Sequence, residues 1–91
     1  MKAILKYTLS PDGAPVEMPV GAEVLTAREQ GDSICVWARV QTTETLKNKR
    51  TFKVFGTGHE MPDDPNLNYV GTAMLQGGGL VMHVFENRFA Q

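Results

Sequence analysis

The residues that could take part in chemistry gather within one stretch of the chain, Thr51 to Glu60. Its glycine-rich segment, Gly56-Thr57-Gly58, is followed directly by His59 and Glu60. A histidine beside a carboxylate can act as a general base, and successive backbone amides in a glycine turn can hold an anion. The same residues also occur in solvated turns, where the glycines only supply unusual backbone angles. The segment lacks the Gly-Lys-Ser/Thr ending of a nucleotide-binding P-loop.

Aromatic and basic side chains provide further candidate binding groups. Trp37 and Arg39 share one face of an alternating stretch, and such a pair can stack on a purine or on a partner protein. The sequence leaves open whether Trp37 is exposed, buried in a second layer or placed at a dimer seam. If the tryptophan and the glycine-histidine corner face one concave surface, they form a site for a nucleotide-like anion. The predicted site consists of Trp37, Arg39, Arg50, Lys53, Gly56, Thr57, Gly58, His59 and His83.

No catalytic or metal-binding set can be assembled from the spacing of polar residues. His59, Asp63 and Asp64 are suitable ligands for a divalent cation, but they match no calcium loop and no His-Glu-x-x-His helix. Acidic residues in a proline turn more often cap the turn. No nucleophile, base and oxyanion donor come together either. We therefore expect a protein that is not an enzyme and that uses no metal or cofactor.

Length and composition point to one small globular domain, residues 1–91, with 42% hydrophobic and 21% charged residues. The formal net charge of -1 and the absence of a basic stripe make duplex nucleic acid an unexpected partner. Cys35 is the only cysteine, which excludes an intrachain disulfide. No stretch resembles a signal peptide or a membrane span. We expect a cytoplasmic protein, and its small core favours a homo-oligomer.

These candidates are positioned by a series of short strands. Turn signals separate alternating segments at the spacing typical of an all-β sandwich or barrel. The segments are Met1–Leu9, Val16–Val20, Gly21–Gln30, Ser33–Gln41, Thr51–Phe55, Tyr69–Gln76 and Leu80–Glu86. We predict an all-β fold with little helix, either a small antiparallel β sandwich or a partly open barrel of six to seven strands.

Several local predictions follow from individual residues. The segments Gly21–Gln30 and Ser33–Gln41 should pair as an antiparallel hairpin, with Leu25, Ala27 and either Ala22 or Val24 facing inward. Pro19 should confine its segment to a sheet edge, because proline has no N–H to donate. Gly71 is expected at a bulge or at a close approach of two backbones. The polar segment Thr42–Lys49 is predicted to be a mobile loop.

Several motifs together resemble a family of small bacteriophage and prophage proteins. They are the Val-Glu-Met-Pro lead-in, the Ile34-Cys35-Val36-Trp37-Ala38 strand, the segment from Lys49 into Gly56-Thr57-Gly58-His59, and the ending Met82-His83-Val84-Phe85-Glu86. The resemblance covers nearly the whole chain. The family is one of unknown function, so it implies a setting, the cytoplasm of an infected bacterium, and assigns no catalytic residue.

Two kinds of binding protein fit this combination. The first sequesters a nucleotide-type signalling molecule of a bacterial defence system, through the predicted site. The second blocks a host defence complex, as an anti-CRISPR protein does, using acidic loop residues such as Asp63 and Asp64 or an exposed sheet edge. A small virion or assembly component is a third possibility.

Overall fold

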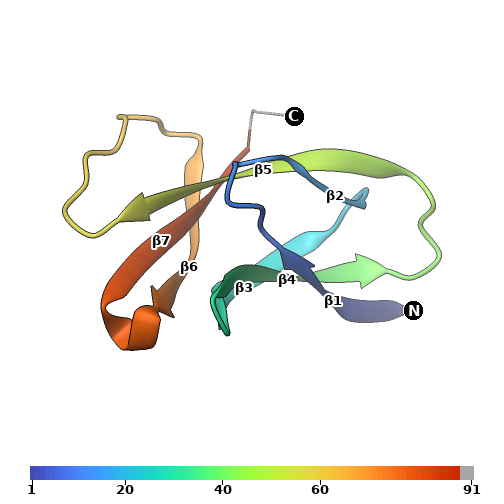
Figure 1. The fold of residues 1–91 in the computed structure, drawn as a ribbon. Coiled ribbons are helices and arrows are strands. Elements are labelled where there is room, and N and C mark those ends of the chain that lie inside the picture. The colour runs from blue at the N-terminus through green and yellow to red at the C-terminus, as the bar shows by residue number, and fades with distance from the viewer. Residues whose placement is uncertain (89–91) are drawn as a thin grey trace.

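A computed structural model describes residues 1–88 of the chain as seven strands around one core (Figure 1). The end of the predicted domain, residues 89–91, lies outside the described residues. The strands are β1 (Lys2–Thr8), β2 (Val16–Pro19), β3 (Glu23–Gln30), β4 (Ser33–Gln41), β5 (Lys47–Gly56), β6 (Leu67–Leu75) and β7 (Leu80–Asn87), with one 3-10 turn, η1 (Gln76–Gly78).

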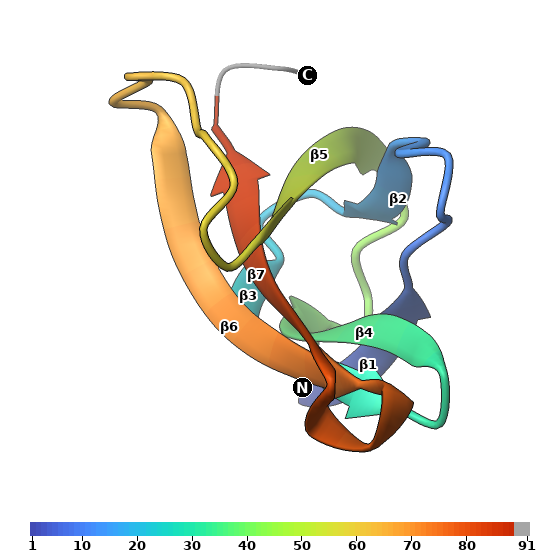
Figure 2. The same cartoon turned by 60° about the vertical axis from the view of Figure 1, so that its left-hand side comes forward.

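The strands form one sheet in the order β1-β4-β3-β6-β7-β5-β2. The sheet curls into a nearly closed barrel, which Figure 2 shows with β5 and β2 above β4 and β1 and with β6 and β7 to their left. The all-β prediction is confirmed, and the barrel alternative is the one realised. Within the described residues, no helix is long and apolar enough to span a membrane.

The hairpin of β3 and β4 forms as predicted and supplies much of the core. The strands pair from Glu23 opposite Arg39 to Gln30 opposite Ser33, and Gly31 makes the reversal with a φ of 61°. Alternation along β4 turns Val36, Ala38 and Val40 into the barrel interior. They pack against residues from the other strands, including Met18, Ala22, Ala27, Phe52 and Val84.

The prediction that Leu25 faces inward is wrong. The register of β3 against β4 shifts between Val24 and Thr26, which leaves Leu25 in a bulge and 38% exposed, whereas Ala27 is fully buried. An extra residue in one strand breaks the strict alternation on which the prediction relied.

The predicted loop over Thr42–Lys49 is shorter in the structure, because β5 already begins at Lys47. Residues Lys47 to Arg50 pair with β2, from Pro19 to Val16. Hydrogen bonding to a neighbouring strand therefore holds a polar segment in an extended conformation that its own composition does not predict. Strand β2 is the last strand of the sheet, so the edge position predicted from Pro19 is confirmed.

Gly71 joins the two halves of the barrel. Its pairing with Ala27 is the one parallel bridge between β3 and β6. The predicted sheet was antiparallel throughout, and the observed sheet departs from that at this bridge. A Cβ atom on Gly71 would lie 2.2 Å from the Ala27 carbonyl oxygen. The register of β6 against β7 also shifts between Tyr69 and Gly71. The structure confirms both predictions for this glycine, the bulge and the close backbone approach.

Candidate functional site

The nine residues predicted to bind a ligand fall into three separate places. Trp37 and Arg39 lie on the outer surface of β4. Trp37 is half-buried opposite Lys6 of β1 and Thr26 of β3, and Arg39 Nε donates to Glu23 Oε1 at 2.9 Å. Strands β3 and β6 separate these residues from β7 and β5 in the sheet. The structure therefore does not bring Trp37 and the glycine-histidine corner to one concave surface.

Arg50 is held inside the fold by a carboxylate. Its Nη2 donates to Glu86 Oε1 at 3.0 Å, its Nε also contacts Glu86 Oε2, and its Nη1 donates to the Ala22 carbonyl oxygen at 3.0 Å. The Arg50 and Glu86 side chains are only 14% and 4% exposed. A buried carboxylate needs a paired cation, and Arg50 supplies it. These contacts explain Arg50 without a ligand.

The remaining predicted residues do come together, where β5 ends beside β7. Phe55 lies directly opposite His83 in the sheet, and Thr57 follows two positions later. His83 Nε2 lies 2.7 Å from Thr57 Oγ1, and His83 Nδ1 lies 3.2 Å from Thr72 Oγ1 of β6. Tyr69 extends this chain of hydrogen bonds, with its Oη 2.5 Å from Thr72 Oγ1. The His83 imidazole is therefore fixed in orientation by two hydroxyl groups, one from the turn after β5 and one from β6.

The Gly56–His59 turn also needs its glycines for space and for backbone angle. The His59 amide donates to the Gly56 carbonyl oxygen at 3.1 Å, which closes the turn. A Cβ atom on Gly56 would lie 2.8 Å from His59 Nδ1, so Gly56 makes room for this imidazole. Gly58 has a φ of +85°, which a side chain disfavours. Both readings of this segment, a structural turn and an anion-binding corner, are compatible with this geometry.

Three aromatic rings on the same surface were missing from the predicted site. The Phe55 and Phe85 ring centroids are 5.9 Å apart and those of Tyr69 and Phe85 are 5.5 Å apart, both in edge-to-face geometry. We call this outer surface of β5, β7 and β6 the aromatic face; it comprises Lys53, Phe55, Tyr69, Thr72, His83 and Phe85. Alternation could have identified Phe55 and Phe85, since they share strand faces with Lys53 and His83. Tyr69 could not be placed, because its neighbour β7 was unknown.

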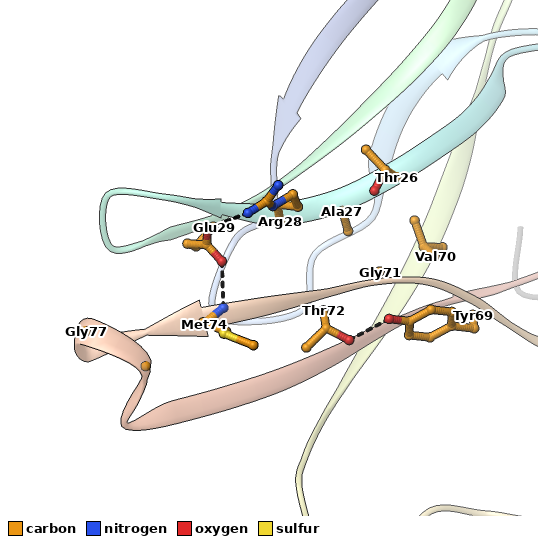
Figure 3. Close-up of a pocket in the computed structure, with 11 residues that line it drawn as sticks. Thr26, Ala27, Arg28, Glu29, Tyr69, Val70, Gly71, Thr72, Met74 and Gly77 are labelled. Atoms are coloured by element: carbon orange, nitrogen blue, oxygen red, sulfur yellow. Dashed lines mark hydrogen bonds and ion pairs between the residues drawn. The ribbon is translucent and has the colours of Figure 1, made fainter.

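An open groove of about 600 Å³ runs beside the aromatic face, between β3 and β6 (Figure 3). Tyr69 and Thr72 line it, and at its far end Glu29 Oε1 accepts the Met74 N–H at 2.7 Å. This hydrogen bond lowers the pKa of the Glu29 carboxyl below its usual range. The Glu29 side chain thus links β3 to β6 beyond their backbone bridge at Ala27 and Gly71. None of the nine predicted residues lines the groove.

The acidic residues of the loop between β5 and β6 do not form an ion site in the structure. Asp64 Oδ1 accepts the Asn66 N–H at 2.9 Å, which is the turn-capping role of such residues. Among residues 1–88, no group of three or more histidine, cysteine, aspartate or glutamate side chains lies close enough to hold a metal ion.

The geometry defines a small all-β domain with an aromatic outer surface. Its whole length, residues 1–91, matches the model of a family described as a domain of unknown function (DUF7352), and the chain belongs to that family. Comparison with curated proteins and with solved structures gives no match.

Proposed function

We propose that this protein is a non-enzymatic binding protein that holds a nucleotide-type ligand on its aromatic face. The observation that carries the proposal is the row of Phe55, Phe85 and Tyr69 on one outer surface, with Tyr69 60% exposed. Apolar rings that are left in contact with water on a sheet surface are a common platform for stacked bases. Stacking tolerates any base, so the proposal names a ligand class rather than one nucleotide.

Charge and hydrogen bonding support the same ligand class. Lys53 is exposed and lies directly opposite Phe85, so a phosphate beside a stacked base is within reach of an ammonium group. His83 is anchored at both ring nitrogens by hydroxyl groups, which gives this surface fixed polar groups between the rings. A chain with a net charge of -1 fits a small anion better than a long polyanion.

The biological setting is part of the proposal. A phage-derived protein in the host bacterial cytoplasm that binds a nucleotide tightly acts in counter-defence by removing a signal. Trp37 and Arg39, on the outer surface of β4, are then available to a second protomer of a homo-oligomer. Inhibition of a host defence complex, anti-CRISPR-like, and a role in the virion are the alternatives that a failed ligand test would favour.

The test is a titration of the ¹⁵N-labelled protein with 5′-AMP, cyclic AMP and cyclic di-AMP, with binding also measured by calorimetry. We expect shifts confined to β5, β6 and β7, and a ligand that is recovered intact. Tyr69→Ala should weaken binding about tenfold, because stacking contributes about 1–3 kcal/mol per base. Ile4→Ala is the matched control, since Ile4 is 59% exposed on β1 and lies away from the aromatic face.

Lys53→Gln tests the phosphate contact, with the exposed Lys2→Gln on β1 as its control. Lys53→Gln should reduce both affinity and its salt dependence, whereas Lys2→Gln should change neither. Absence of shifts with all three nucleotides, or equal effects of the Tyr69 and Ile4 substitutions, would refute nucleotide binding at this face. Turnover of the ligand would refute the non-enzymatic part alone. Sedimentation equilibrium gives the number of protomers.

A further inference from the structure

The inner side of the barrel contains a second concave site, at the end where the β6–β7 hairpin meets the β3–β4 turn. It is a hollow of about 770 Å³, which lies in the size range of small-molecule sites. Its walls are side chains that alternation turns inward: Phe52 and Val54 of β5, Met82 of β7 and Ile34 of β4. A ligand that enters this hollow buries its apolar surface against these inward-facing side chains.

The rim of this hollow carries a negative charge from Asp32. Within residues 1–88, Asp32, in the turn between β3 and β4, is the only ionisable side chain that lines it. Among the described residues, no hydrogen bond or ion pair holds the exposed Asp32 carboxylate. The other polar side chains of the lining are the hydroxyl groups of Thr8, Ser10 and Ser33. The site therefore combines an apolar interior with an anionic group at its mouth.

The remaining wall is a loop with internal support. The segment from Leu9 to Ala14 contributes to the lining, and the Gly13 amide donates to the Ser10 carbonyl oxygen at 3.0 Å. Asp12 Oδ1 accepts the Ala14 N–H at 2.9 Å. These bonds hold the loop in shape without a ligand, so binding there costs little ordering entropy.

We infer that this hollow binds a small amphiphilic cation, with its apolar body among Phe52, Val54 and Met82 and its protonated amine beside Asp32. The apolar walls recognise the body by burying it from water, and the carboxylate selects a positive head over a negative one. The site is independent of the aromatic face, because the two lie on opposite sides of β5 and β7: alternate residues of each strand line them.

A matched ligand series tests this inference. Octylammonium, octanol and octanoate share one apolar chain and differ in the charge of the head group. Titration below the micellar concentration, followed by ¹³C NMR of the methyl groups, should shift Val54, Ile34 and Met82. We expect affinity to fall in the order ammonium, alcohol, carboxylate. Equal affinity for all three ligands, a preference for octanoate, or shifts outside the hollow would overturn the inference.

Two substitutions separate the charge from the cavity. Asp32→Asn, at an exposed turn, should weaken octylammonium binding about threefold and leave octanol unchanged, as expected for one exposed charge pair. Asp63→Asn, in the exposed loop before β6, is its control. Leu80→Trp places an indole at the mouth and should abolish binding of all three ligands, whereas Met74→Trp, on the exposed outer side of β6, should not. Unchanged octylammonium binding in both Asp32→Asn and Leu80→Trp would refute the site.

Discussion

Replacing Gly71 by alanine places a methyl group where the structure has the backbone of Ala27. The new Cβ atom would lie 2.2 Å from the Ala27 carbonyl oxygen and 2.7 Å from the Ala27 nitrogen. Both atoms belong to the backbone of Ala27, a fully buried residue, so no flexible side chain can move aside. The single β3–β6 bridge must therefore open for the methyl group to fit.

The free-energy cost of this substitution can be estimated from the overpacked contact with Ala27. Overpacking a close contact typically costs about 1–3 kcal/mol, and a backbone clash belongs at the upper end. We therefore expect Gly71→Ala to lower the free energy of unfolding by about 3 kcal/mol, out of the roughly 5–14 kcal/mol typical of a domain this size. For a chain of this length, that loss corresponds to a decrease in Tm of about 12–24 °C.

Thermal denaturation monitored by circular dichroism measures this decrease, and amide hydrogen exchange at Ala27 reports opening of the bridge. Gly79→Ala is the matched control, because Gly79 has a φ of -74° and its Cβ would lie 3.4 Å from the Gln76 carbonyl oxygen. That substitution should leave Tm unchanged or raise it slightly, since alanine restricts the unfolded chain. A Tm of Gly71→Ala within about 3 °C of the wild type, less than one kcal/mol of destabilisation, would contradict the assigned packing.

Two further predictions concern charged side chains. Arg50→Met should destabilise the fold by about 3 kcal/mol in urea denaturation, because it removes the buried cation of Glu86 and leaves the more exposed Arg88, whose Nε lies 3.9 Å from Glu86 Oε1. The double variant Arg50→Met/Glu86→Leu should recover most of that loss. If the double variant is no more stable than Arg50→Met, loss of the ion pair is not the cause of the destabilisation. The hydrogen bond from the Met74 N–H lowers the pKa of Glu29 in the folded state. The contribution of Glu29 to folding stability is therefore complete above its unfolded-state pKa of about 4.5 and is lost as the pH falls through its lower folded-state pKa. The protection factor of the Met74 amide, which compares its exchange rate with the intrinsic rate at the same pH, should fall over that acidic interval in the wild type and show no such step in Glu29→Gln.

Alternation of apolar and polar residues along a strand shows which residues share a face of that strand, and this limits what the sequence predicts of the fold. Alternation along Ser33–Gln41 correctly predicts a strand, its hairpin partner and its buried face, because those depend on neighbours close in the chain. It cannot report which distant strands are adjacent. For that reason the parallel meeting of β3 with β6 and the partnership of Arg50 with Glu86 could not be predicted.

The same limit applies to the candidate site, because its residues come partly from neighbouring strands and partly from strands that are distant in the sheet. Lys53, Thr57 and His83 were selected from the sequence and do lie near one another, because all three occupy paired strands or the turn that follows. The prediction that Trp37 shares a concave surface with them depends on which distant strands are adjacent, and the sheet order separates Trp37 from them. Tyr69 was overlooked, since it becomes a candidate only when its position opposite Phe85 is known.

The lone bridge between Ala27 and Gly71 also bears on the order of folding events. The β3–β4 and β6–β7 hairpins each connect through a short turn, so each can form on the microsecond scale without the rest of the chain. Their mutual docking closes a long intervening segment and gains only one backbone pairing, which makes it the slow step. Before this docking the two hairpins have open edges, so we expect the chain to be most prone at that stage to pair with a neighbouring copy.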